Sequence, residues 1–379
     1  MRIESIIARE LKMRLKAPFE TSFGVTQDRR VVLLEVQTDV GTGWSEVTAM
    51  EGPYYNAETI HTAWIMGREF LSALVLDVDV ASPEEISELM ENVRGQEMAK
   101  AAIECAAWDA FARSKGESLS KILGGTRDVV ASGVSLGIQS DTGKLLDAVA
   151  KELADGYRRV KLKIKPGKDV AVVAAVRKSF PDIDLTVDAN SSYRLEDAEL
   201  LKQLDDFALS YIEQPLPWND IYQHSLLQPQ LKTAICLDEC IHGVRDAEAA
   251  IALGACRVIN IKLGRVGGHS AARKIQALCL AKGIPVWCGG MLESGVGRAH
   301  NIAMSTLPGF VFPGDVSASQ RYWIEDIIEP EVSVTPEGTI HVPTAPGIGY
   351  RIKVAEIEKR TVRREEWTNR VSVAVGAIL

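Results

Sequence analysis

Three segments decide the fold of this chain: 159-RVKLKI-164, 184-DLTVDAN-190 and 209-LSYIEQP-215. Each is a short run of β-branched and apolar residues with charged residues near its end, and each begins 25 residues after the one before it. Residues of helical character follow every run, so the pattern predicts strands that alternate with helices. This alternation is typical of a parallel sheet built through right-handed crossovers.

The same alternation continues on both sides of these segments. One strand-like run precedes them and three follow them: 129-VVASGVSLGI-138, 235-ICLDEC-240, 257-RVINIKLG-264 and 284-IPVWCGG-290. A long series of such units favours a closed, TIM-like β/α barrel over an open sheet. The sequence therefore predicts an α/β fold class with the barrel at residues 126–325.

The parts of the chain outside the barrel have a different pattern. Residues 1–125 predict an α+β domain, with a strand at 31-VVLLEV-36 and an amphipathic helix at 98–113. Residues 326–379 return to strand-like and turn sequence, and we expect them to pack back on the N-terminal domain. A chain of 379 residues is longer than one compact core usually supports, which agrees with a barrel plus a second domain.

Composition excludes several classes of partner. The formal net charge is −8, with acidic and basic residues interspersed, which argues against nucleic acid or an anionic membrane as the main partner. The charged start of the chain predicts no secretory signal, and no run is long enough to span a bilayer. The six cysteines lack paired CxxC spacing, so we interpret them as reduced, buried thiols of a cytoplasmic protein.

Charged residues recur at the ends of the predicted strands, where a buried parallel strand would be apolar. Asp188, Glu213 and Asp238 follow one another at intervals of 25 residues, which places them on neighbouring strands at similar depth. Three converging carboxylates repel one another unless a hard cation lies between them, so the spacing predicts a Mg²⁺ site, with Mn²⁺ as a substitute. The alternative is three unrelated acids that each cap a helix.

Lysines accompany these acids. Lys161 and Lys163 alternate on one strand, so both point into the barrel, and Lys262 lies on a later strand across the mouth. A lysine acts as a base near neutral pH when a neighbouring cation lowers its pKa; Lys161 and the metal could do this for Lys163, and Arg265 for Lys262. The alternative is that these lysines bind the substrate carboxylate or pair with the metal-site acids.

These segments, taken together, resemble the enolase superfamily in its muconate-lactonizing-enzyme-like branch. More closely, they are similar to the o-succinylbenzoate synthase / N-acylamino acid racemase family. The resemblance rests on YRRVKLKIKPG, LTVDANSSY, YIEQPL, CLDEC, VINIKLGRVGGH and WCGGMLESGVGRAHN, and it extends to PFETSFG and PGDVSASQRYW. It implies a (β/α)7β barrel with an α+β capping domain made by the N-terminal part and the C-terminal tail. It also implies a homo-oligomer, because members of the family are commonly oligomers.

By resemblance, the three acids match metal ligands, and Lys163 and Lys262 match two acid/base lysines. Supporting positions fall on Lys161, Asn190, Glu239 and Arg265. One departure is Cys240, where many relatives have serine. The implied chemistry is removal of the proton alpha to the carboxylate of a small substrate, which gives an enediolate.

Two reactions can follow from this intermediate: dehydration to o-succinylbenzoate, and racemisation of an N-acylamino acid with the two lysines on opposite faces. A muconate-type cycloisomerase is a more distant alternative. A non-catalytic barrel is disfavoured, because all five residues of the catalytic set are present.

Substrate contacts are expected from two capping loops and from the barrel mouth. The candidates are Phe19, Ser22, Phe23, Met50, Tyr55, Ser135, Gly290, Met291, Glu293 and Trp323. Their mixture of apolar surface and few charges suits a succinyl or acyl chain on a hydrophobic body. For Phe19, Met50 and Trp323, ordinary core packing is an equally good interpretation. His269 and His300 are interpreted as capping or core residues.

Overall fold

The computed structural model describes residues 1–21 and 24–369 of the chain. Two predicted substrate-binding residues, Ser22 and Phe23, lie outside the described residues. None of the helices in the described ranges has the length and apolar character needed to cross a membrane.

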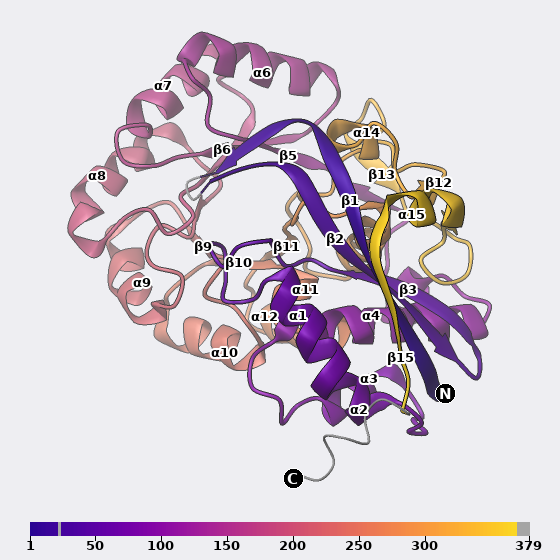
Figure 1. The fold of residues 1–379 in the computed structure, drawn as a ribbon. Helices are drawn as coiled ribbons and strands as arrows, with labels where there is room; N and C mark the ends of the chain where they lie inside the picture. The colour runs from indigo at the N-terminus through magenta and orange to yellow at the C-terminus, as the bar shows by residue number, and fades with distance from the viewer. Residues whose placement is uncertain (22–23, 370–379) are drawn as a thin grey trace.

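A parallel sheet of seven strands curls through the middle of the molecule in the order β11-β10-β9-β8-β7-β6-β5. Its strands are β5 Gly133–Leu136, β6 Arg159–Lys163, β7 Asp184–Asp188, β8 Ile212–Glu213, β9 Ile235–Leu237, β10 Val258–Ile261 and β11 Val286–Cys288. The helices that follow them along the chain are α6 Thr142–Ala154, α7 Val170–Ser179, α8 Ala198–Lys202, α9 Ile221–Leu227, α10 Val244–Leu253, α11 Leu263–Val266, α12 His269–Ala281 and α13 Gly295–Ser305. Figure 1 shows α6 to α10 on the outside of the sheet. The predicted alternation of strands and helices is confirmed.

Residues 310–316 close this curled sheet between its two edges. On one side, Phe310 pairs in parallel with Val286 of β11, and the Asp315 amide donates to the Cys288 carbonyl at 2.8 Å. On the other side, Gly314 pairs with Ser132, beside β5. The barrel is therefore closed by an irregular eighth segment, which agrees with the predicted TIM-like barrel.

Aromatic residues pack against one another inside the barrel. Tyr211 stacks on Trp287 with ring centroids 5.6 Å apart, and Phe312 meets Tyr211 edge to face. Both Tyr211 and Trp287 are fully buried. These aromatic rings therefore fill part of the barrel interior.

The capping domain is built on an antiparallel sheet with the order β15-β1-β2-β3. Its strands are β1 Ile3–Thr21, β2 Gly24–Thr38, β3 Gly41–Val47 and, from the C-terminal tail, β15 Thr361–Trp367. Its helices are α1 Ile60–Met66, α2 Ser72–Val75, α3 Pro83–Leu89, α4 Glu97–Ser114 and α5 Leu119–Leu123. Figure 1 shows the long hairpin of β1 and β2 reaching across the barrel. The domain boundaries at 125 and 325 stay predictions.

The remaining small elements lie beside the barrel and come from the tail and from two segments that precede it in the chain. They are β4 Val129–Ala131, which pairs with β13 Thr339–His341; β12 Ile328–Glu329, which pairs with β14 Arg351–Ile352; and the helices α14 Ser319–Tyr322 and α15 Val354–Arg360.

Helix α4 differs from its prediction in one respect. The helix is present where it was expected, but residues 98–110 are all buried, so it is not amphipathic. The reason is its position, because it packs against β3 on the capping side and against α11 and α12 on the barrel side. A helix covered on all sides needs small and apolar residues around its whole circumference.

Two buried carboxylates join the capping domain to the barrel at the first turns of barrel helices. Glu104 of α4 accepts from the amides of His269 and Ser270 at the start of α12, each at 2.8 Å. Glu46 of β3 accepts from the amides of Ser294 and Gly297 at the start of α13, at 3.1 and 3.2 Å. Each acid therefore satisfies helix N–H groups that have no partner within their own helix.

Candidate active site

The predicted charged residues converge at the carboxyl ends of the barrel strands. Lys163 lies opposite Asp188 in the pairing of β6 with β7, and Asp188 lies opposite Glu213 in the pairing of β7 with β8. Asp238 directly follows β9, and Lys262 directly follows β10. The register of the parallel sheet thus brings side chains about a hundred residues apart in the sequence to one mouth.

Lys161 forms the centre of a buried ion-pair network. Its ammonium group lies 2.7 Å from Glu213, 2.8 Å from Asp315 and 3.3 Å from Asp188. Burial alone would lower the pKa of Lys161, but Asp315, Glu213 and Asp188 more than offset this and raise it well above its ordinary value. Lys161 is therefore a permanent cation, which fits its predicted supporting role better than that of a base.

Lys163 pairs with one carboxylate, whereas Lys161 pairs with three. Its ammonium donates to Asp188 at 2.6 Å and to the Asn190 side-chain oxygen at 2.7 Å. Asn190 has a left-handed backbone with φ of 41°, and its side-chain amide donates to Glu239 at 2.9 Å. Burial, with Asp188 nearby, raises the pKa of Glu239 to about 7. Asn190 thus connects the lysine of one strand to the acid of another.

Lys262 is enclosed by residues from both domains. It donates to Asp238 at 2.8 Å and to the hydroxyl of Tyr55, a capping-domain residue, at 3.0 Å. Arg265 donates to the same hydroxyl at 2.9 Å and pairs with Asp238. Burial would lower the pKa of Lys262, but Tyr55 and the acids Glu239 and Glu213 raise it well above its ordinary value.

The carboxylates of the predicted metal-ligand triad, Asp188, Glu213 and Asp238, differ in their electrostatic environments. Burial would raise the pKa of Asp188, but Lys163 and Lys161 outweigh it and hold that pKa below its usual range. The pKa of Glu213 is raised, first by burial and then by the charge of Asp188. Glu213 also accepts from the Asn260 side-chain amide at 2.8 Å. Lysine and amide donors therefore neutralise acids that would otherwise repel one another.

The residues present fit a hard divalent cation. Asp188, Glu213 and Asp238 offer oxygen ligands, which Mg²⁺ and Mn²⁺ prefer. Within the described residues, only Cys105, His269 and His300 bring three possible ligand atoms of Cys, His, Asp or Glu within 4.8 Å of one another. The carboxylate oxygens of Asp188, Glu213 and Asp238 are therefore spread more widely than this. Lys161 contacts two of the three triad acids, and Lys262 contacts the third. The ammonium groups thus supply the positive charge that a cation would supply.

A cavity of about 70 Å³ opens beside these residues. Lys163, Lys262 and Asn190 line it together with five of the predicted substrate-binding residues: Phe19, Met50, Tyr55, Gly290 and Met291. A larger hollow of about 520 Å³ shares Thr26, Met50 and Tyr55 with it, and is lined mainly by residues 24–29 and by residues of the segment 50–55. The cavity therefore has a capping wall and a barrel wall, and both lysines face it.

Three predicted substrate-binding residues lie elsewhere. Ser135 donates to Asp315 at 3.0 Å and lines a neighbouring hollow. Glu293 accepts from Asn301 at 2.9 Å and is buried. Trp323 is 1% exposed, and its indole donates to the backbone carbonyl of Glu293. The core-packing alternative thus describes Trp323 better than ligand contact does.

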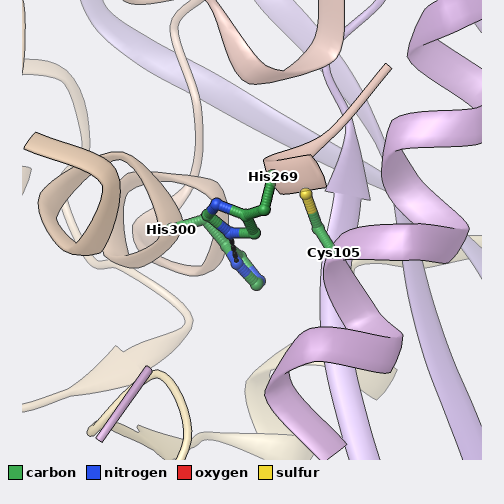
Figure 2. A group of neighbouring side chains, drawn as sticks. All are labelled: Cys105, His269 and His300. Carbon is green, nitrogen blue, oxygen red and sulfur yellow. Dashed lines mark hydrogen bonds between the residues drawn. The ribbon is translucent and has the colours of Figure 1, made fainter. Parts of the chain in front are cut away.

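The cluster of Cys105, His269 and His300 lies between the capping domain and the barrel (Figure 2). The His300 Nε2 donates to the Trp44 carbonyl at 2.8 Å, so the Nδ1 of that ring accepts from the His269 Nε2 at 3.0 Å. Burial lowers the pKa of both histidines, which keeps them neutral. Hydrogen bonding explains the approach of the rings, and their burial agrees with the prediction of core histidines.

Two residues of the network were not predicted from the sequence. Asp315 lies in the irregular closing segment, after a Pro-Gly pair, where no strand pattern marks it. Asn260 lies inside the apolar strand 258-VINI-261, and a polar side chain there was the signal that could have revealed it.

Family models match most of the chain. Residues 2–124 match the N-terminal domain of mandelate racemase / muconate lactonizing enzyme, and residues 144–357 match the enolase C-terminal domain-like family. With the barrel, its capping domain and the carboxylate–lysine mouth, the chain belongs to the enolase superfamily and, within it, to the mandelate racemase / muconate lactonizing enzyme family.

Individual relatives are similar to the chain over nearly its whole length. An o-succinylbenzoate synthase of Geobacillus kaustophilus is 51% identical over 95% of this chain and 96% of its own length. An N-succinylamino acid racemase of Thermus thermophilus is 46% identical over 96% of this chain and 98% of its own. A solved enolase-superfamily structure from Listeria innocua superposes with a TM-score of 0.94 at 45% identity, covering 97% of this chain and all of that one.

Proposed function

We propose that this protein is a divalent-metal-dependent enzyme that removes the proton alpha to a substrate carboxylate, acting as an o-succinylbenzoate synthase and as an N-succinylamino acid racemase. The observation that carries the proposal is that Lys163 and Lys262 line one cavity beside three strand-end carboxylates. Full-length relatives with each of these two names support it.

The metal ligands in this proposal are Asp188, Glu213 and Asp238. Enzymes of this superfamily typically depend on a divalent metal. A bound Mg²⁺ or Mn²⁺ would stabilise the negative charge that develops on the substrate carboxylate.

The lysines carry out the proton transfers. Lys163 has two contacts, with Asp188 and Asn190, that hold its Nζ at the cavity wall, and it removes the alpha proton. In racemisation, Lys262 delivers a proton to the opposite face of the planar carbon. In dehydration, Lys163 returns its proton to the departing β-hydroxyl, and Lys262 remains a cation beside the anionic intermediate.

Capping residues complete the site in this proposal. Phe19 and Met50 give the cavity an apolar wall for the body of the substrate, and Tyr55 orients Lys262 through its hydroxyl.

Proton NMR in D₂O with Mg²⁺ tests the proposal. The pure enzyme is offered N-succinyl-L-phenylalanine and the o-succinylbenzoate precursor in parallel reactions. Loss of the alpha-proton signal together with formation of the other enantiomer establishes racemisation, and formation of the aromatic product establishes the synthase. Turnover of neither substrate by enzyme that binds Mg²⁺ contradicts both reactions.

A further inference from the structure

Asp315 has a fixed position at the edge of the carboxylate network. Its backbone amide donates to the Cys288 carbonyl at 2.8 Å, which anchors the closing segment to β11. The two oxygens of its side chain have different partners. Oδ1 accepts from Arg159 at 2.7 Å, whereas Oδ2 lies 2.8 Å from the Lys161 ammonium and accepts from Ser135 at 3.0 Å. One oxygen thus faces the barrel interior and the other faces the mouth.

The ammonium group of Lys161 is shared between two kinds of carboxylate. Glu213 and Asp188 are metal ligands in the proposed function, and Asp315 is not. We propose that Asp315 is a positioning residue, which draws Lys161 toward the wall of the barrel and so keeps Asp188 and Glu213 available to a divalent cation. This inference rests on the proposed function for the identity of the metal ligands.

The physical reason is competition for the same oxygens. An ammonium group has three N–H donors and pairs with as many acceptors as it can reach. Without the charge of Asp315, the ammonium would be balanced by Asp188 and Glu213 alone, and it would hold them more tightly against a cation. In a buried site such competition is strong, because charges there are poorly screened by water.

A purely structural role is the alternative. Arg159 is fully buried, and Asp315 could serve only to neutralise it. However, Arg159 uses Oδ1, donates as well to the Pro313 carbonyl at 2.8 Å, and lies over the Trp287 ring at 5.0 Å. The second oxygen is left for Lys161 and Ser135. The two roles therefore make different predictions for metal binding.

Asp315→Asn tests the proposal, with Asp326→Asn as the matched control. The Asp315 side chain is 12% exposed and Asp326 is fully buried, but the partners of Asp326 are Ser319, the Gly295 amide and Arg298. Calorimetry on EDTA-stripped enzyme measures the Mg²⁺ dissociation constant, and steady-state kinetics measure kcat and KM. Thermal melts of all three proteins report any structural damage.

We expect Asp315→Asn to raise the Mg²⁺ dissociation constant and to lower kcat, each by about 10- to 100-fold, the range usual for residues that orient metal ligands. The substrate KM at saturating Mg²⁺ should change less than about threefold, because Asp315 is not among the residues that line the cavity beside the two lysines. Asp326→Asn should lower the melting temperature and leave the Mg²⁺ dissociation constant unchanged.

Wild-type Mg²⁺ affinity and kcat in Asp315→Asn, with a lowered melting temperature, would overturn the proposal. If that variant does not fold, Asp315→Glu keeps the charge and displaces it by one methylene. Weaker Mg²⁺ binding at an unchanged melting temperature then supports the proposal, and unchanged binding overturns it. A wild-type enzyme that binds Mg²⁺ but converts neither substrate contradicts only the proposed reactions, and one that binds no Mg²⁺ overturns the role of Asp315 as well.

Discussion

The barrel mouth and the junction between the domains both bury carboxylates, but the partners of these carboxylates differ. At the mouth, Asp188 and Asp315 are paired with lysine and arginine, which hold their pKa values below the usual range despite burial, whereas burial raises the pKa values of Glu213 and Glu239. At the junction, Glu46 and Glu104 are held by backbone amides and serine hydroxyls, and burial raises the pKa of each to about 7.

The two sets of partners fit different roles for the two regions. Full positive charges keep an acid ionised, which a site for a divalent cation requires. Helix amides orient an acid and supply only a partial positive charge, so they fix the geometry between two domains without forcing ionisation. Substitutions at the mouth should therefore change catalysis and metal binding, and substitutions at the junction should change stability.

The largest expected effect is at the mouth. Lys163→Ala should reduce both racemisation and dehydration by about 10²- to 10⁴-fold, because each reaction needs a base at that position. Steady-state assays on both substrates measure it. Glu104→Gln is the comparison from the junction, and its turnover should stay within about threefold of the wild type. Substantial turnover by Lys163→Ala in either reaction would remove Lys163 as the base.

Lys262→Ala should distinguish the roles of the two lysines. We expect racemisation to be lost, while one enantiomer of N-succinyl-phenylalanine still exchanges its alpha proton for deuterium, because Lys163 remains. Chiral chromatography and proton NMR in D₂O measure the two processes on one sample. Full racemisation by this variant would refute the two-base mechanism.

Metal binding at the barrel mouth should stabilise the folded protein, and this gain should depend on the mouth carboxylates and not on those of the junction. At a Mg²⁺ concentration 100 times its dissociation constant, the free energy of unfolding should rise by about 2.7 kcal/mol, and EDTA should remove the gain. Asp238→Asn should lose most of this increment, whereas Glu104→Gln should keep it. Equal Mg²⁺ stabilisation of Asp238→Asn and the wild type would exclude Asp238 as a ligand.

Regular strands explain how much of the molecule could be predicted from the sequence. The barrel, the capping domain and the convergence of Lys163, Asp188 and Glu213 followed from period and spacing, because parallel strands in register align their ends. Asp315 was missed because the closing segment has no strand period. Glu46 was missed because its partner, Ser294, lies 248 residues away, and no local pattern reports such a contact.

Helix α4 was also predicted only in part. Its helical period was evident in the sequence, but its complete burial was not, because burial depends on α11, α12 and β3 packing around it. Likewise, the position of Tyr55 between Lys262 and Arg265 depends on how the capping domain docks on the barrel. Contacts between the ends of regular strands followed from pattern, whereas contacts of the irregular closing segment and contacts between domains required the structure.

The smallest expected effect tests the junction through pH. Because the pKa of Glu46 is about 7 in the folded protein and 4.5 is its ordinary value, the folded state holds a proton that the unfolded state releases between these values. Its contribution to stability is therefore fully present below pH 4.5 and is lost as pH rises to 7, which amounts to about 2 kcal/mol between pH 5 and pH 8.

Glu46→Gln keeps one oxygen, which can accept from the Ser294 amide or from the Gly297 amide, and it cannot ionise. Relative to the wild type, this variant should gain about 2 kcal/mol of unfolding free energy when the pH is raised from 5 to 8. Urea unfolding at both pH values measures the change. Glu199→Gln, at a side chain 84% exposed, is the control and should show no such gain. An equal response of Glu46→Gln and Glu199→Gln would mean that Glu46 is ionised throughout, and the contrast between mouth and junction would then fail at this residue.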